Sequence, residues 1–242
     1  KTVQESLAYL ADLMRAIDNQ GKQMEIILCV PFSVIKSMAD KAKDPTVISI
    51  SGQDVHWEEW GAYTGEISPP MLADLGAQYC MIGHSERRKY FEETDESVNK
   101  KALSLLKSAV RPIVCIGETL EERQLGLTIN ILEKQLRVCF NGFSSADLEK
   151  TVILYEPRWA IGTGNVAKND QIASAHQYIR EALVQLFSSQ SANRTRIIYG
   201  GSVTIDNTSD ILKIKDVDGV GVGGASLDLP NFLQIIDVMT AA

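Results

Sequence analysis

The sequence predicts an α/β fold built on a parallel sheet, and two observations carry this prediction. Seven short apolar runs rich in β-branched residues recur along the chain, and most are followed by apolar residues at helical spacing. Continuous apolar runs flanked by helices indicate strands that are covered on both faces. At 242 residues, with 45% hydrophobic residues and no recognisable linker, the chain is expected to form one domain over residues 1–242.

The expected elements follow in a regular order. Apolar residues from Ser6 to Met14 predict a first helix that ends near Gly21. A parallel barrel closes with eight strands, so either the sheet is open and doubly wound or the chain given begins just after a first strand. The seven strands are expected at residues 24–30, 47–51, 79–82, 113–116, 152–155, 197–199 and 219–222.

An acidic residue stands at the end of the fifth apolar run. Glu156 follows residues 152–155, at the strand edge where α/β enzymes gather catalytic groups. Pro157 fixes one backbone angle and two glycines free the backbone a few residues later, which indicates a stiff hinge carrying a mobile tip. A carboxylate beside such a loop suits proton transfer. The alternative is that Glu156 is a helix-entry acid and the glycines are ordinary turns.

Other candidate groups fall at the same edge of the sheet. His84 is one of three histidines and comes just after the strand expected at 79–82, although a single histidine is more often structural than catalytic. Glycine pairs at 200–201 and 223–224 follow the last two strands. Backbone N–H groups can approach an anion closely where side chains are absent, so both pairs suit a phosphate, with plain β-to-α turns as the alternative.

Taken together, these motifs resemble the triosephosphate isomerase family. Residues 155–164 (YEPRWAIGTG) match the family's lid loop. Four further signatures occur in the family's order, at 83–88 (GHSERR), 115–118 (CIGE), 199–203 (YGGSV) and 223–227 (GGASL). The resemblance covers essentially the whole chain and implies a (β/α)8 TIM barrel. It also implies a first strand with an Asn-x-Lys motif ahead of Lys1, which is itself not the catalytic lysine.

The resemblance implies the chemistry as well. It makes Glu156 the base that removes a proton beside the substrate carbonyl and His84 the group that polarises this carbonyl, a pairing established in the family. The reaction would interconvert dihydroxyacetone phosphate and D-glyceraldehyde 3-phosphate through an enediol(ate), in glycolysis and gluconeogenesis, without cofactor or metal ion. A helix opening at Ser85 is expected to keep His84 neutral. Glu86 and Cys115 are expected to support the site, or to be an arginine partner and a packed core thiol.

The resemblance assigns further residues to binding and to the lid. Substrate and phosphate contacts are expected at Gly162, Ser202, Gly223 and Gly224. The lid is expected to comprise Pro157, Arg158, Trp159, Ala160, Ile161, Gly162, Thr163 and Gly164. The chain departs from the family pattern at Arg158 and Asn165 in the two hinges, and at Gly221, where the family has a larger apolar residue.

A long loop after the second expected strand, residues 53–66, carries Trp57, Trp60 and Tyr63. Three aromatic side chains are unusual in a solvated loop, so the loop is expected to dock on a partner. The resemblance implies a homodimer in which this loop inserts beside the neighbouring active site, with Thr64 nearest to it.

Composition excludes other classes. The net charge of −7 and the lack of a basic cluster argue against a nucleic acid partner. No apolar run approaches the roughly 18 residues of a membrane span, so no membrane partner is expected. Four widely spaced cysteines lack metal-binding spacing and are expected to be reduced thiols in a cytoplasmic protein.

Two other functions stay open at this point. Another phosphate-binding barrel, such as an aldolase or a sugar-phosphate epimerase, would share the glycine pairs. A Schiff-base aldolase needs a lysine at a strand end, and none of the seven expected strands offers one. A non-enzymatic alternative is an inactive or engineered barrel that acts as a dimerising scaffold. An assay with either triose phosphate distinguishes these functions.

Overall fold

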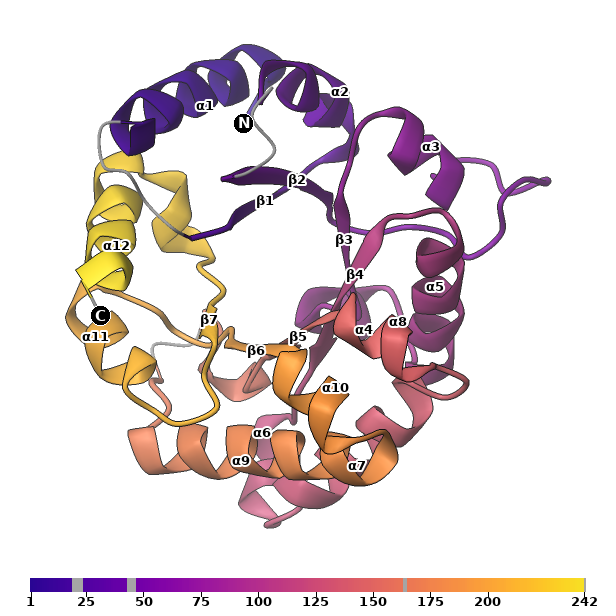
Figure 1. Cartoon of the computed structure of the whole chain (residues 1–242), viewed down its shortest axis with the longest axis vertical. Coiled ribbons are helices and arrows are strands. Elements are labelled where there is room, and N and C mark those ends of the chain that lie inside the picture. The colour runs from indigo at the N-terminus through magenta and orange to yellow at the C-terminus, as the bar shows by residue number, and fades with distance from the viewer. Residues whose placement is uncertain (19–23, 43–46, 163–164, 242) are drawn as a thin grey trace.

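The computed structural model describes residues 1–18, 24–42, 47–162 and 165–241, and Figure 1 shows their strands curling around a centre inside a ring of helices. The strands run parallel and lie side by side in sequence order. They are β1 Ile26–Val30, β2 Ile48–Gly52, β3 Tyr79–Ile82, β4 Arg111–Ile116, β5 Val152–Tyr155, β6 Arg196–Tyr199 and β7 Gly219–Val220. The seven predicted strands are confirmed, although the last one ends two residues earlier than expected.

Strand order decides between the two predicted sheets. A doubly wound sheet reverses its strand order at a switch point, whereas here each strand pairs with the next one in sequence from β1 to β7. The sheet therefore wraps in one direction, as in a barrel. The fold class predicted from the resemblance is confirmed.

Helices cover the outer face of the sheet. Most follow a strand, as the alternation in the sequence predicted, and α1 precedes β1. Several begin with a side chain that accepts a backbone N–H, such as Thr94 before α5 and Thr119 before α6. The α-helices are α1 Val3–Asp18, α2 Phe32–Lys41, α3 Pro69–Asp74, α4 Ser85–Tyr90, α5 Asp95–Lys107, α6 Leu120–Gln124, α7 Thr128–Cys139, α8 Ser145–Glu149, α9 Asn169–Leu186, α10 Ser189–Arg194, α11 Ile205–Leu212 and α12 Leu229–Ala241, and the 3₁₀ turns are η1 Arg158–Ala160 and η2 Gly224–Leu227.

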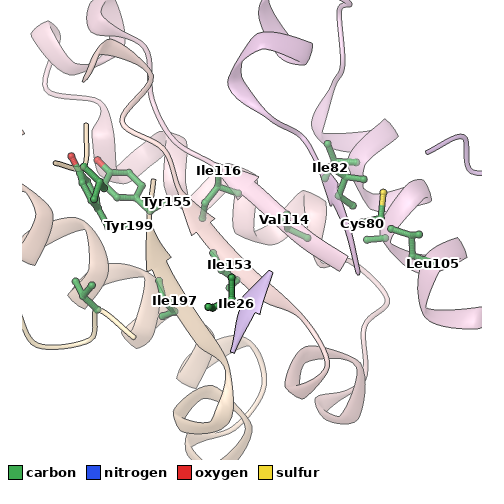
Figure 2. Close-up of a cluster of buried hydrophobic side chains, with 14 of the residues drawn as sticks. Ile26, Cys80, Ile82, Leu105, Val114, Ile116, Ile153, Tyr155, Ile197 and Tyr199 are labelled. Carbon is green, nitrogen blue, oxygen red and sulfur yellow. The ribbon is translucent and has the colours of Figure 1, made fainter. Parts of the chain in front are cut away.

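The core has two parts because strand side chains alternate between the faces of the sheet. In β4, Val114 and Ile116 point outward and pack under the helices, in the cluster drawn in Figure 2. Ile113 and Cys115 point the other way, into a smaller cluster that fills the inside of the barrel. The four cysteines are free, as predicted, and three of them are fully buried.

No described helix is long and apolar enough to cross a membrane. Within the same ranges, no group of three or more acidic, cysteine or histidine side chains could hold a metal ion.

Candidate active site

Glu156 and His84 lie in contact at the carboxyl ends of β5 and β3. The Nε2 atom of His84 is 3.1 Å from Oε1 of Glu156. Glu156 is buried, with 3% of its surface exposed, whereas His84 keeps part of its ring open to solvent. The two residues lie 72 positions apart in the sequence and were predicted from the strand ends that they follow. The fold brings their side chains into direct contact.

Strand pairing fixes the position of Glu156. In the register of β4 and β5, Ile116 stands opposite Tyr155, and the Glu156 N–H donates to the Ile116 carbonyl at 2.7 Å. Gly117 then lies directly against the Glu156 backbone, where a Cβ atom on Gly117 would sit 1.8 Å from the Glu156 carbonyl oxygen. Glycine is therefore required at Gly117 by the close approach of the two strand ends.

Helix α4 begins at His84 and orients both side chains. The Nδ1 atom of His84 accepts the Glu86 N–H at 3.3 Å, and Oε2 of Glu156 accepts the Ser85 N–H at 2.9 Å. Because Nδ1 acts as an acceptor, the proton of a neutral ring resides on Nε2, the atom that faces Glu156. The arrangement presents an N–H donor and a carboxylate side by side.

The charge environment of His84 differs from the sequence-based expectation. Burial lowers the pKa of His84, but the hydrogen bond and charge of Glu156, with smaller contributions from Glu86 and Glu93, outweigh burial and raise it. Only the helix end after His84 can be recognised in the sequence, and this helix end favours the neutral ring. The neutral ring therefore stays a prediction, and the contact with the Glu156 carboxylate acts against the effect of the helix end.

The two glycine pairs lie at the same edge of the sheet. Gly223 and Gly224 are exposed, and a Cβ atom built on either would meet nothing within 4 Å. Gly201 is different, because its Cβ atom would lie 2.1 Å from the Tyr199 hydroxyl oxygen. The glycine at 201 is thus required by packing against its own strand, whereas the pair at 223–224 faces open space.

Comparison with known proteins identifies the family. The family model described as triosephosphate isomerase matches residues 1–239. The chain belongs to the triosephosphate isomerase family. A triosephosphate isomerase of Citrifermentans bemidjiense is 47% identical over 236 residues, covering 98% of this chain and 93% of the relative, and one of Alkaliphilus oremlandii is 45% identical, covering 93% and 92%. The crystal structure of triosephosphate isomerase from Bartonella henselae superimposes with a TM-score of 0.87 at 33% identity, covering 97% of this chain and 93% of that one.

The family and the isomerase function predicted from the motifs are confirmed by these matches. The departure from the triosephosphate isomerase pattern at Gly221 has a local reason. A Cβ atom at Gly221 would lie 2.8 Å from Cδ1 of Leu154, a β5 side chain inside the barrel. Leu154 therefore fills the space that a larger residue at 221 would need.

The two supporting residues behave differently. Cys115 is fully buried inside the barrel, and burial together with the Glu156 charge raises its pKa well above the usual value. It is a neutral packed thiol and no nucleophile. The carboxylate of Glu86 is largely exposed and lies 3.9 Å from Nδ1 of His84. The alternative that Glu86 pairs with an arginine is not found among the described ion pairs.

Glu118 is a residue that the sequence analysis did not single out. Its carboxylate is fully buried and accepts the indole N–H of Trp159 at 2.8 Å and the Tyr155 hydroxyl at 3.1 Å, while Arg123 pairs with it at 3.0 Å. The Glu118 carbonyl also accepts the Arg158 N–H at 3.0 Å. The start of the predicted lid, residues 157–160, is therefore fastened to the loop after β4.

The rest of the predicted lid is described only in part. Gly162 has φ +66°, in the left-handed region that favours glycine, and a Cβ atom there would meet open space. Arg158, the first hinge departure, is half-buried, and burial together with the nearby Arg88 lowers its pKa. Thr163 and Gly164 lie outside the described residues.

Proposed function

We propose that this chain interconverts dihydroxyacetone phosphate and D-glyceraldehyde 3-phosphate, with Glu156 as the base and His84 as the electrophile. The contact of 3.1 Å between these side chains at the strand ends is the observation that carries the proposal. It pairs a proton acceptor with an N–H donor, as isomerisation at adjacent carbons requires. The reaction belongs to glycolysis and gluconeogenesis, so we propose the cytoplasm as its compartment.

The isomerisation transfers one proton between two neighbouring carbons and one between their oxygens. Glu156 removes a proton from the carbon beside the carbonyl, and the bonding electrons form an enediolate. The N–H of His84 at Nε2 then gives its proton to the oxygen where negative charge develops, and the same nitrogen takes up the proton of the hydroxyl on the neighbouring carbon. Glu156 returns its proton to the neighbouring carbon, so the product has the same atoms and charge as the substrate.

Before Glu156 can accept a proton from the substrate, one of its existing hydrogen bonds must be replaced. The two carboxylate oxygens are occupied by the Ser85 N–H and by Nε2 of His84. A substrate carbonyl that accepts from Nε2 would take one of these donors and free the carboxylate to turn toward the C–H bond. Glu156 is buried, so water has little access to its carboxylate.

The substrate phosphate is proposed to bind the backbone N–H groups around Ser202, Gly223 and Gly224, with Gly162 added from the lid. The open space beside Gly223 and Gly224 supports this site. With a net charge of −7, the chain needs local N–H donors to admit a phosphorylated substrate.

A coupled assay tests the reaction directly. Dihydroxyacetone phosphate is supplied and glyceraldehyde 3-phosphate is followed by an NAD-dependent dehydrogenase, and the assay is repeated in the opposite direction. Turnover in both directions supports the isomerase, whereas cleavage or epimerisation of a larger sugar phosphate without triose turnover would indicate another phosphate-binding barrel.

We also propose that the chain forms a homodimer through the loop at 53–66 and the end of α4. Apolar side chains gather on these segments with much of their surface exposed, such as Trp60 at 86% and Phe91 at 65%. Exposed apolar groups of this size favour association. Trp57 instead packs on its own chain, stacked on His56 and beneath Lys100, and Thr64 is exposed near the tip.

A buried ion network fastens this loop to the barrel. Lys101 of α5 lies 2.7 Å from both Asp54 of the loop and Glu93, and Arg87 of α4 pairs with the same two carboxylates at 2.7 and 3.3 Å. Asp54, Glu93 and Lys101 are each less than 10% exposed. The loop that we propose for the interface thus depends on charges held inside the monomer.

Lys101→Met is expected to lower the free energy of unfolding by about 3 kcal/mol, because Asp54 and Glu93 stay buried with only Arg87 to balance them. It should also weaken the dimer, since the loop loses its anchor. Urea unfolding and sedimentation at micromolar concentration check both effects, with Lys107→Met at the exposed end of α5 as the control. A variant as stable and as dimeric as the control would contradict the anchoring role.

A further inference from the structure

We propose that Tyr9 is a positioning residue for the phosphate-binding turn at 223–227, which it holds in place through the carbonyl of Ser226. The inference rests on the function proposed above and deepens it, because it names a residue outside the site that shapes the phosphate-binding part of it. Tyr9 lies on α1, and the turn lies next to α12 at the other end of the chain.

The contact is direct and spans the chain. The Tyr9 hydroxyl donates to the Ser226 carbonyl at 2.7 Å across 217 residues of sequence. Helices α1 and α12 lie side by side in Figure 1, which brings the tyrosine to the turn. Burial, together with the charge of Asp228, raises the pKa of Tyr9 to about 12. The phenol therefore remains a hydrogen-bond donor throughout the neutral pH range.

The turn itself is organised around one carbonyl. The Gly223 carbonyl accepts both the backbone N–H of Ser226, at 2.9 Å, and its hydroxyl, at 2.7 Å. In a trans peptide the C=O and the following N–H point in opposite directions. Since the Gly223 carbonyl faces into the turn, the Gly224 N–H faces out of it. A Cβ atom built on Gly223 or Gly224 would meet nothing within 4 Å, so the outer side of the turn is open.

Ser226 therefore keeps the Gly224 N–H directed outward. Its own carbonyl is held by the Tyr9 hydroxyl on α1. Two consecutive glycines make a turn that is costly to order, because glycine has the widest choice of backbone conformations. The ring of Tyr9 packs against the core, so its hydroxyl offers a fixed point to the Ser226 carbonyl. A turn that is ordered before binding pays less entropy when the phosphate arrives.

The expected effect is on binding and not on chemistry. Tyr9 does not touch the reacting carbons, and a contact that stabilises substrate and transition state equally raises KM with little change in kcat when it is lost. Losing one hydrogen bond of ordinary strength corresponds to roughly a 3- to 10-fold change in affinity. A residue with only a structural role would lower thermal stability without this division between KM and kcat.

The experiment uses Tyr9→Phe in the full chain, which removes one oxygen and keeps the ring. We expect KM for either triose phosphate and the inhibition constant of inorganic phosphate to rise together by about 3- to 10-fold, with kcat within about 2-fold of wild type. Tyr178→Phe on α9, another half-buried tyrosine that packs on the core, is the control. Unchanged constants for Tyr9→Phe, or a fall in kcat at constant KM, would overturn the inference.

Failure of the proposed function can be distinguished from failure of this inference. If wild type does not isomerise triose phosphates, the proposed function fails, and calorimetric titration with inorganic phosphate still tests the turn. Weaker phosphate binding by Tyr9→Phe than by wild type and Tyr178→Phe would support the role of Tyr9. Equal binding by all three proteins, or no phosphate binding by wild type, would overturn it.

Discussion

Glu156→Asp is expected to leave the barrel folded and to lower kcat by about 10²-fold or more. The shorter side chain withdraws the carboxylate by roughly 1 Å from the position where it receives the substrate proton, and misplacement of this size costs about two orders of magnitude. Burial of Glu156 between the Ser85 N–H and His84 leaves little room for the backbone to compensate. KM should change much less than kcat, because the carboxylate acts in the transition state.

The measurement is a steady-state assay in both directions, together with thermal unfolding to establish that the fold is kept. Glu133→Asp on α7 is the control, because it makes the same chemical change far from the strand ends. Glu133 forms only an exposed ion pair with Arg137, at 3.0 Å. Wild-type turnover in Glu156→Asp would mean that another group is the base.

The strands could be predicted from the sequence because most of them are largely apolar runs, although β2 alternates isoleucine with serine. In β5, residues 152–155 are all buried, so no polar alternation interrupts the pattern. The edge of the sheet to which Glu156 and His84 belong followed from the same runs, since parallel strands bring their carboxyl ends together. Direct contact between the two side chains could not be predicted, because it depends on strand register and on how α4 begins.

Glu118 shows where sequence reasoning stops. It belongs to the motif at 115–118, but the donors that identify its role come from Arg123, Tyr155 and Trp159, which lie 5 to 41 residues away along the chain. The direction in which the pKa of His84 shifts could not be predicted from the sequence for the same reason. The helix end beside it is visible in the sequence, whereas the carboxylate of Glu156 reaches it only in the fold. The sequence therefore shows signals from neighbouring residues, whereas partners that are distant along the chain are known only from the fold.

The exposed glycine pair and the buried glycines illustrate a further difference. All match the same simple pattern, a glycine just after a strand. Only the structure separates Gly223, which faces open space, from Gly117, which lies against another backbone. This difference predicts different effects of substitution on packing, because a side chain at Gly223 meets no atom of the protein whereas one at Gly117 must displace Glu156.

Gly117→Ala is accordingly expected to damage both stability and activity. The added Cβ atom would lie 1.8 Å from the Glu156 carbonyl oxygen, far inside contact distance. Gly117 cannot simply move away, because Gln135 of α7 accepts its N–H at 2.8 Å and donates to its carbonyl at 3.3 Å. The ends of β4 and β5 must therefore separate, and the Glu156 carboxylate moves with β5.

Separation of the strand ends by roughly 1 Å should lower kcat by about 10²-fold, as for Glu156→Asp. In contrast to Glu156→Asp, the free energy of unfolding should also fall, by about 1 to 3 kcal/mol, because the variant overpacks the site. Gly142→Ala is the matched control. Gly142 has φ +80°, but a Cβ atom there meets nothing within 4 Å, so the alanine variant has backbone strain without a steric clash. Urea unfolding and the steady-state assay are run on both variants. If Gly117→Ala kept the turnover and stability of Gly142→Ala, the close approach of Gly117 to Glu156 would not be what positions the base.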